Sequence, residues 1–241
     1  MTVRFAFFGG LVLLALAWWR EDALPPPADI RDELLAEPLQ RPRALPAFTA
    51  HASGVDYRVQ PRYSYELHGL VVSRHDAAVW WDSAHAEWND HLNVVDLCVV
   101  WGENIRRDAY RDIRYTHDQW TCWYSTRSAE AYARFDPSAI SNSHLITDDP
   151  AIARALRAAR VGDQIRVRGY LADYRLPSGF TRVSSSVRDD TGNGACEVVY
   201  VDAFEILQAG GGSWRTLKWV ALAMLAVSIV VWFAQPHRRH N

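Results

Sequence analysis

The sequence is nearly devoid of lysine and has little net charge. Lys218 is the only lysine, so arginine supplies almost all of the 26 basic residues, and 28 acidic residues bring the formal net charge to −2. A protein that depends on attraction to nucleic-acid phosphates normally carries a clear excess of positive charge. The composition therefore argues against nucleic acid as the partner.

Several motifs of catalysis and cofactor binding are also missing. The chain has no glycine-rich phosphate-binding loop, no dinucleotide-binding fingerprint and no closely spaced cysteine pairs of the zinc-binding kind. His85 and His91 are six residues apart, unlike the four-residue spacing of a zinc-binding helix. Asp96, Glu103 and Arg106 are residue types that a metal-dependent nuclease needs, but their spacing matches no known signature. The sequence thus predicts no catalytic residue, no metal site and no cofactor.

The C-terminal part contains a long apolar segment. Residues 217–234 carry a single charge, on Lys218, and are long enough to cross the roughly 30 Å hydrocarbon core of a bilayer. Trp214, Trp219 and Trp232 lie near the two ends, where aromatic belts form at membrane interfaces. We expect a transmembrane helix here, preceded by a Gly-rich linker at 209–216.

The N-terminal part contains a shorter apolar segment. Residues 5–19 are apolar and follow Arg4, which is typical of either a membrane anchor or a secretory signal peptide. Trp18 and Trp19 would directly follow a cleavage site at Ala17, so the pair favours a retained anchor over residues 1–22.

Basic residues outside the two apolar segments predict the orientation. Arg4 precedes the first segment, and Arg238 and Arg239 follow the second, in the tail 235–241. Because cytoplasmic flanks are enriched in Lys and Arg, we expect both termini in the cytoplasm and the central part in the periplasm or outside the cell. The lipid bilayer, as the inner or plasma membrane, is then the first partner.

The central part divides into a linker and one domain. Residues 23–48 contain repeated prolines, which favour an extended stalk with at most a short helix at Asp29 to Glu37. Residues 49–208 have the size of a single folded domain.

Within this domain the pattern predicts mainly strands with helical insertions. We expect strands at 64–73, 93–102, 119–125, 161–176 and 195–207, and a helix that begins at Asp149-Pro150 and ends at Gly162. The order of three strands, a helix and two strands resembles the OB-fold, a five-stranded Greek-key barrel. The stretches "DLCVVWG" and "SNSHLITDDP" also resemble those of an uncharacterised group of membrane-tethered bacterial proteins.

The strand at 161–176 provides the candidate binding face. Ile165, Val167, Gly169 and Leu171 alternate with the polar residues Arg166, Arg168, Tyr170 and Tyr174. The OB-fold resemblance implies that such a face binds ligands, here a glycan, an anionic molecule or another envelope protein. A solvated strand face without a ligand has the same pattern.

The aromatic stretch at 80–102 raises the question of a second site. Trp81, His85, Trp88 and Leu92 have helical spacing, which predicts one packing stripe with His85 in the core. His144 lies in a segment that we expect to be a loop, and no partner can be assigned to it.

The three cysteines bear on the compartment. Cys98 lies in an apolar strand, which predicts a small buried hydrophobic residue. The OB-fold resemblance places the third and last strands side by side, and this implies a disulfide between Cys122 and Cys196 in an oxidising compartment. Unpaired thiols are the alternative.

These patterns together predict a membrane-anchored, non-catalytic binding or assembly module of the bacterial cell envelope, with an extracytoplasmic OB-like domain. The alternative is a cytoplasm-facing domain that binds single-stranded nucleic acid, with arginines on the phosphates and tyrosines stacked on bases, or a tethered nuclease-like enzyme.

Overall fold

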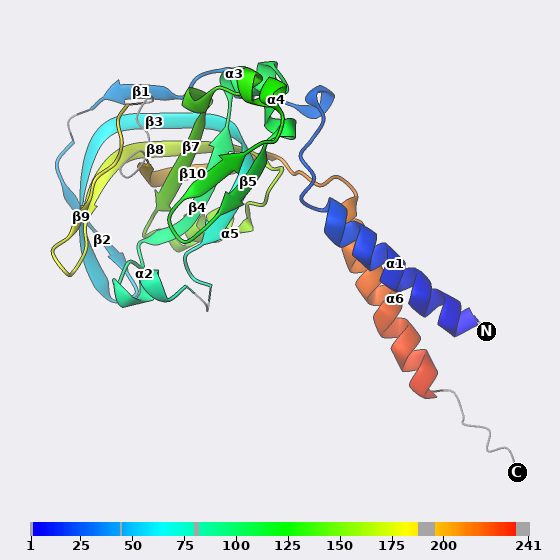
Figure 1. Cartoon of the computed structure of the whole chain (residues 1–241). Coiled ribbons are helices and arrows are strands. Elements are labelled where there is room, and N and C mark those ends of the chain that lie inside the picture. The colour runs from blue at the N-terminus through cyan, green and yellow to red at the C-terminus, as the bar shows by residue number, and fades with distance from the viewer. Residues whose placement is uncertain (1, 44, 80–81, 188–195, 235–241) are drawn as a thin grey trace, which may run out of the picture. The chain divides into compact units, whose positions relative to one another are not determined.

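The computed structural model describes residues 2–43, 45–79, 82–187 and 196–234 (Figure 1). The chain divides into two compact units, one made of residues 1–23 with 210–241 and the other of residues 24–209. The C-terminal tail from 235, with Arg238 and Arg239, lies outside the described residues.

The first unit consists of two helices, α1 (Thr2–Arg20) and α6 (Trp214–Ala234), which pack against each other. Arg4 lies over the ring of Trp232, and Glu21 forms an ion pair with Lys218. The start of α1 therefore lies beside the end of α6, and the two helices are antiparallel.

Both helices are long and apolar enough to span a membrane. Their large side chains are mostly uncovered: Trp19, Trp219 and Phe233 are 73, 68 and 78% exposed. An apolar surface of this extent is costly in water and suits contact with lipid.

The second unit is mainly β. Its strands are β1 (Leu39–Pro42), β2 (Phe48–Ala52), β3 (Val55–Asp76), β4 (Asn93–Val100), β5 (Arg114–His117), β6 (Cys122–Ser125), β7 (Ile140–Ile146), β8 (Gln164–Arg175), β9 (Thr181–Arg182) and β10 (Glu197–Gln208). Its short helices are α2 (Ser83–Glu87), α3 (Gly102–Arg106), α4 (Ala129–Arg134) and α5 (Pro150–Ala158), with 3-10 turns η1 (Pro27–Asp29), η2 (Asp32–Leu35), η3 (Ala109–Asp112) and η4 (Pro137–Ala139).

One large mixed sheet contains all strands except β5 and β6. Its order is β1-β3-β4-β7-β10-β8-β9, with β2 paired to β3, and β3 also pairs with β8 (Figure 1). The pairings β3-β4-β7-β10-β8-β3 thus form a closed ring. The β7–β10 pairing is parallel, and the other four are antiparallel.

Strand β3 closes the ring because successive parts of it pair with two different ring strands. Residues Arg58–Leu70 face β8, whereas Leu70–Asp76 face β4. Register shifts at Pro61/Tyr63 and Val71/Ser73 bend the strand between its partners. Inside the ring, apolar side chains from all five strands form the main core, including Leu67, Leu97, Leu145, Val167 and Val199.

Helix α5 begins as the sequence predicts. The Asp149 carboxylate accepts hydrogen bonds from the backbone N–H groups of Ala151 and Ile152, at 2.6 and 3.2 Å, and Pro150 occupies the first turn. Both features stabilise a helix N-terminus because these N–H groups have no partner within the helix.

The prediction that residues 119–125 form the third strand of the barrel is wrong. Residues 114–125 form a separate hairpin of β5 and β6, and the strand between β4 and β10 is β7, in the segment expected to be a loop. Most β7 side chains are buried on both faces, so the strand lacks the alternation of a half-exposed one. The pattern therefore concealed it.

The stalk expected at 23–48 is also corrected. Residues 24–48 belong to the barrel unit, where β1 pairs with β3 and Leu34 is fully buried. Ile30 and Leu35 pack in the same cluster as Leu34. Prolines shorten the helical turns here, but the apolar residues between them still bind this segment to the barrel.

Candidate functional site

The predicted binding face on β8 is only partly exposed. Arg166 pairs with Glu66 at 2.8 Å and Arg168 with Asp202 at 3.0 Å. Tyr170 is half-buried, and the Arg43 guanidinium lies 5.9 Å from the centre of its ring.

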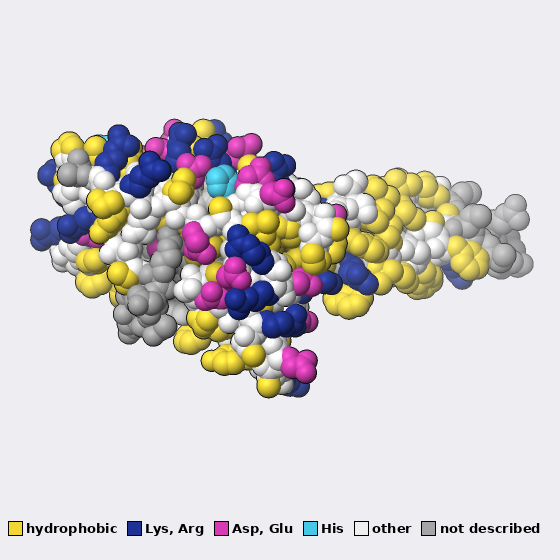
Figure 2. Space-filling view, turned by 90° about the horizontal axis from the view of Figure 1, so that it is seen from above, with side chains coloured by type: hydrophobic (Ala, Val, Ile, Leu, Met, Phe, Trp, Pro, Cys, Tyr) yellow, Lys and Arg dark blue, Asp and Glu magenta, His cyan; other side chains and the backbone are white. Residues whose placement is uncertain are grey.

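A groove of about 390 Å³ lies beside these residues. Its charged and aromatic lining consists of Arg41, Arg43, Tyr65, Glu66, Arg168, Tyr170 and Asp202. Arg41 and Arg43 are exposed, and among the described residues neither has a carboxylate within salt-bridge distance. Figure 2 looks onto the side of the barrel that carries β1, where basic side chains gather with acidic ones between them. We call the groove lined by these residues the arginine groove.

Tyr174 does not belong to the exposed face. Its side chain is fully buried, and its hydroxyl donates to the Asp90 carboxylate. The alternation along β8 correctly places Tyr174 on the opposite side of the strand from Leu171. However, the segment 82–92 covers this end of β8. The expectation that Tyr174 contacts a ligand is therefore wrong.

A second polar region lies on the side of β3, β4 and β7 opposite the main core. The strand register places His75, Asp96 and His144 in one row across these strands. Ser73, Cys98 and Asn142 form the next row. We call these six residues the polar face.

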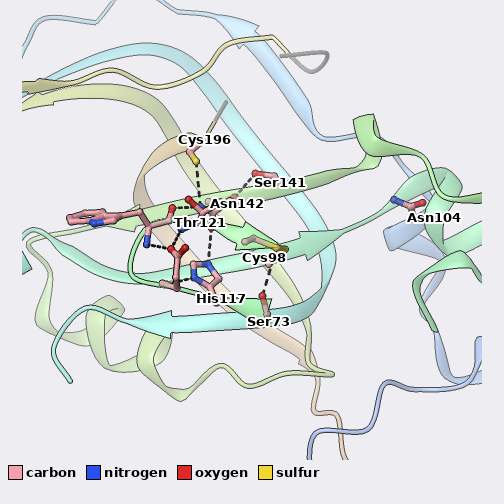
Figure 3. The surroundings of a disulfide bond; sticks show 12 residues. Ser73, Cys98, Asn104, His117, Thr121, Ser141, Asn142 and Cys196 are labelled. Carbon is pink, nitrogen blue, oxygen red and sulfur yellow. Dashed lines mark hydrogen bonds between the residues drawn. A yellow bond between two sulfur atoms is a disulfide. The ribbon is translucent and has the colours of Figure 1, made fainter. Parts of the chain in front are cut away.

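The β5–β6 hairpin covers the polar face. Cys122 of β6 forms a disulfide with Cys98, and Ser73 Oγ lies 3.7 Å from Cys122 Sγ (Figure 3). His117 Nε2 donates to Asn142 Oδ1 at 2.9 Å. The disulfide therefore fastens the hairpin directly to β4.

This disulfide corrects two expectations. Cys122 pairs with Cys98 and not with Cys196, and Cys98 is a bridged residue and not a free buried thiol. The last strand, β10, pairs with β7 and β8, so Cys196 lies beside Asn142 of β7, while the hairpin that carries Cys122 is bonded to β4. The assumed identity of the third strand caused the error.

His75, Asp82 and His85 form a buried cluster at one edge of the polar face. Asp82 Oδ2 lies 2.6 Å from His75 Nε2 and 2.6 Å from His85 Nδ1. Burial works to raise the pKa of Asp82, but hydrogen bonds from both histidines lower it below its usual value.

The donor set of this cluster is one that metals accept, with three ligand atoms within 4.8 Å of one another. The surrounding hydrogen bonds favour a different arrangement. Asn93 Nδ2 donates to Asp96 Oδ1 at 2.8 Å and lies 3.1 Å from His85 Nε2. His85 Nε2 must then accept a hydrogen bond from the Asn93 amide. His85 therefore carries its hydrogen on Nδ1 and donates it to Asp82. A metal would need Nδ1 without hydrogen.

Asp96, His144 and Cys196 form a second line of contacts. Asp96 Oδ1 lies 2.8 Å from His144 Nδ1, both side chains are buried, and the imidazole also hydrogen-bonds to Cys196. Burial alone would lower the pKa of His144, but the Asp96 carboxylate and the bond to Cys196 raise it to about 10. Burial likewise works to raise the pKa of Asp96, and His144 and Asn93 hold it below its usual value. At neutral pH the two side chains are a charged pair.

The predicted packing stripe of 81–92 is only partly present. Leu92 is buried in the core and His85 is buried in the polar cluster, but Trp88 is 48% exposed. Trp81 lies outside the described residues. Helix α2 is too short to form the stripe, and Trp120 of the hairpin covers His85, with ring centres 4.1 Å apart.

The three nuclease-type residues do not form one cluster. Asp96 pairs with His144, whereas Glu103 pairs with Arg106 on the surface at 2.9 Å.

The sequence does carry a signal for the polar face. Each of its strands has two polar or sulfur-containing residues two positions apart: Ser73 and His75, Asp96 and Cys98, Asn142 and His144. Residues two apart lie on one side of a strand. The apolar character of their neighbours masked this pattern.

Comparison with protein-family models, curated proteins and solved structures finds no match.

Proposed function

We propose that the protein is a membrane-anchored binding module whose barrel is of the OB type and lies outside the cytoplasm. The strand order β3-β4-β7-β10-β8, the parallel β7–β10 pair and a helix between β7 and β8 support an OB-type Greek key. The bent strand β3, which pairs with β8 along its first part and with β4 along its last, is a further feature of a small closed barrel.

The extracytoplasmic position has two supports. The antiparallel packing of α1 and α6 brings Arg4 beside Trp232, at the C-terminal end of α6, and basic flanks favour the cytoplasm. The Cys98–Cys122 disulfide suits an oxidising compartment. Both observations favour a barrel in the periplasm or outside the cell, held by the inner or plasma membrane.

Reporter fusions test this topology. Alkaline phosphatase joined after residue 208 should be active, and a fluorescent protein that folds only in the cytoplasm should be dark at the same position. The opposite pair of results would place the barrel in the cytoplasm and favour the nucleic-acid alternative.

The arginine groove is the site that supports binding, and we propose an anionic ligand, such as an acidic glycan or an acidic envelope protein. The observation that carries the proposal is the pair of exposed arginines, Arg41 and Arg43, beside Tyr170. Arg168 and Arg166 already have acidic partners, so Arg41 of β1 and Arg43, which directly follows β1, supply the unbalanced positive charge. Arginine binds carboxylates and phosphates in a bidentate manner, and tyrosine offers a flat apolar surface to a sugar ring.

Titration of the detergent-solubilised protein with a fluorescent oligogalacturonate, an acidic glycan, tests the groove. The triple variant Arg41→Ala, Arg43→Ala, Arg168→Ala should bind at least about tenfold more weakly, because each lost charged contact contributes about 1 kcal/mol or more. The matched control replaces the exposed Arg114, Arg127 and Arg154, which lie outside the groove. Equal loss in both variants, or binding that is unchanged in the groove variant, would contradict the proposal.

A further inference from the structure

Two side chains form hydrogen bonds to the thiol of Cys196. Asn142 Nδ2 donates to Cys196 Sγ at 3.3 Å (Figure 3). The His144 imidazole hydrogen-bonds to the same residue. His144 and Asp96 are buried, whereas Cys196 is partly exposed. Donors directed at a sulfur, one of them on a cation, stabilise its negatively charged form.

Neighbouring contacts fix the amide of Asn142 in this orientation. Its Nδ2 also donates to the Trp120 carbonyl at 2.7 Å, so the NH2 group faces both Trp120 and Cys196. Its Oδ1 faces His117 Nε2, which donates to it. The other His117 nitrogen lies 2.7 Å from the Asp118 carbonyl, so both ring nitrogens face oxygen acceptors.

The imidazole of His144 is fixed from behind by its ion pair with Asp96, which in turn accepts a hydrogen bond from Asn93 Nδ2 at 2.8 Å. A thiol, an imidazole in contact with it and a carboxylate that orients the imidazole are the parts of an activated nucleophile. Among the described cysteines, only Cys196 is free to react, since Cys98 and Cys122 are bonded to each other.

We propose that Cys196, His144 and Asp96 form a thiol–disulfide exchange site, in which Cys196 Sγ attacks a disulfide bond of a second molecule. A new bond joins Sγ to one sulfur of that disulfide, the original sulfur–sulfur bond breaks, and the other sulfur leaves as a thiolate that takes a proton from water. The incoming disulfide is the only oxidant required. The inference does not depend on the arginine groove.

The reaction of the full-length protein in detergent with 4,4′-dithiodipyridine, a neutral disulfide that releases a coloured thiol, tests this site. We expect one equivalent of coloured product at about pH 7, at least about tenfold faster than from the same protein unfolded in guanidinium chloride. Cys196→Ser should release none. His144→Gln and Asp96→Asn should bring the rate to that of the unfolded chain, and His68→Gln, a histidine of β3 outside the site, should keep the wild-type rate.

The wild-type protein alone provides a second readout, in case a variant does not fold. The titratable groups connected to Cys196 in this network are His144 on β7, Asp96 on β4, His117 on β5 through Asn142, and the adjacent Glu197 on β10. At about pH 7 the folded wild-type protein should release the coloured product at least about tenfold faster than the same protein unfolded in guanidinium chloride, because unfolding removes the contacts of Cys196 with Asn142 and His144. A native rate no faster than the unfolded one would overturn the proposal.

Discussion

Tyr174 donates its hydroxyl hydrogen to the Asp90 carboxylate, and its oxygen lies 2.7 and 2.8 Å from the two carboxylate oxygens. Tyr174 belongs to β8, and Asp90 to the segment that connects β3 with β4. Both side chains are buried, and Arg182 reaches the same carboxylate at 3.5 Å. The bond therefore fastens the connecting segment to the barrel wall.

Removal of this hydroxyl should destabilise the barrel. In Tyr174→Phe the buried Asp90 carboxylate loses a donor that no water can replace, which costs about 1–3 kcal/mol. Urea unfolding followed by tryptophan fluorescence measures the change. Tyr132→Phe, at a tyrosine that is 67% exposed, is the control and should leave the midpoint in place. Equal midpoints for the two variants would mean that the Asp90 contact contributes nothing.

The His144–Asp96 pair should make stability depend on pH. The pKa of His144 is about 10 in the folded protein and about 6.5 in an unfolded chain, because the Asp96 carboxylate overcomes the effect of burial. Because the pKa of His144 is higher in the folded state, protonation of His144 stabilises the folded protein fully below about pH 6.5. This stabilisation disappears as the pH rises toward 10. We expect the free energy of unfolding to fall by a few kcal/mol over this range.

Denaturant titrations at about pH 6, 8 and 10 measure this slope, with His144→Gln as the comparison. The variant should be less stable at pH 6 and should lose much less stability as the pH rises. Parallel curves for the two proteins would assign the pH dependence to other groups.

The disulfide should contribute mainly to the attachment of the β5–β6 hairpin. The bond joins residues 24 positions apart, and a loop of this length is stabilised by about 3 kcal/mol when it is closed. The double variant Cys98→Ser, Cys122→Ser should unfold at a lower urea concentration, and a reductant should no longer affect it. Cys196→Ser should retain the sensitivity to reductant. If that variant becomes insensitive instead, the cysteines are paired differently.

Gly169 should tolerate no side chain. A Cβ atom at this position would lie 2.0 Å from the Tyr200 carbonyl oxygen and 2.9 Å from its carbon, both in the backbone of β10. Gly169→Ala must therefore push β8 and β10 apart, and we expect a loss of about 3 kcal/mol or more. Gly9→Ala in α1, where nothing lies within 4 Å of the added atom, should leave the barrel transition unchanged. The thermal midpoint of the barrel distinguishes the two cases.

Local patterns in the sequence predicted those elements whose surroundings are simple. The cap at Asp149 and the alternation of Ile165, Val167 and Leu171 each depend on near neighbours, and the structure confirms both. Strand β7 was missed because it is covered on both sides, on one by the core and on the other by the hairpin.

The polar face was missed for a related reason. Asp96 and Cys98 lie among valines and leucines, so β4 resembles a strand that is apolar on both sides. His144 compensates the buried charge of Asp96. It is 48 residues away in the chain and comes next to Asp96 only because β4 pairs with β7. The partner of a buried charge cannot be found from its neighbours in the sequence.

The continuity of β3 has a consequence for how the barrel comes apart. The same 22 residues form one seam with β8 and another with β4, and Leu70 takes part in both. Because both seams depend on one continuous strand, displacement of β3 from β8 also disturbs its pairing with β4. The five-stranded ring should melt in one step, with no stable half-open form.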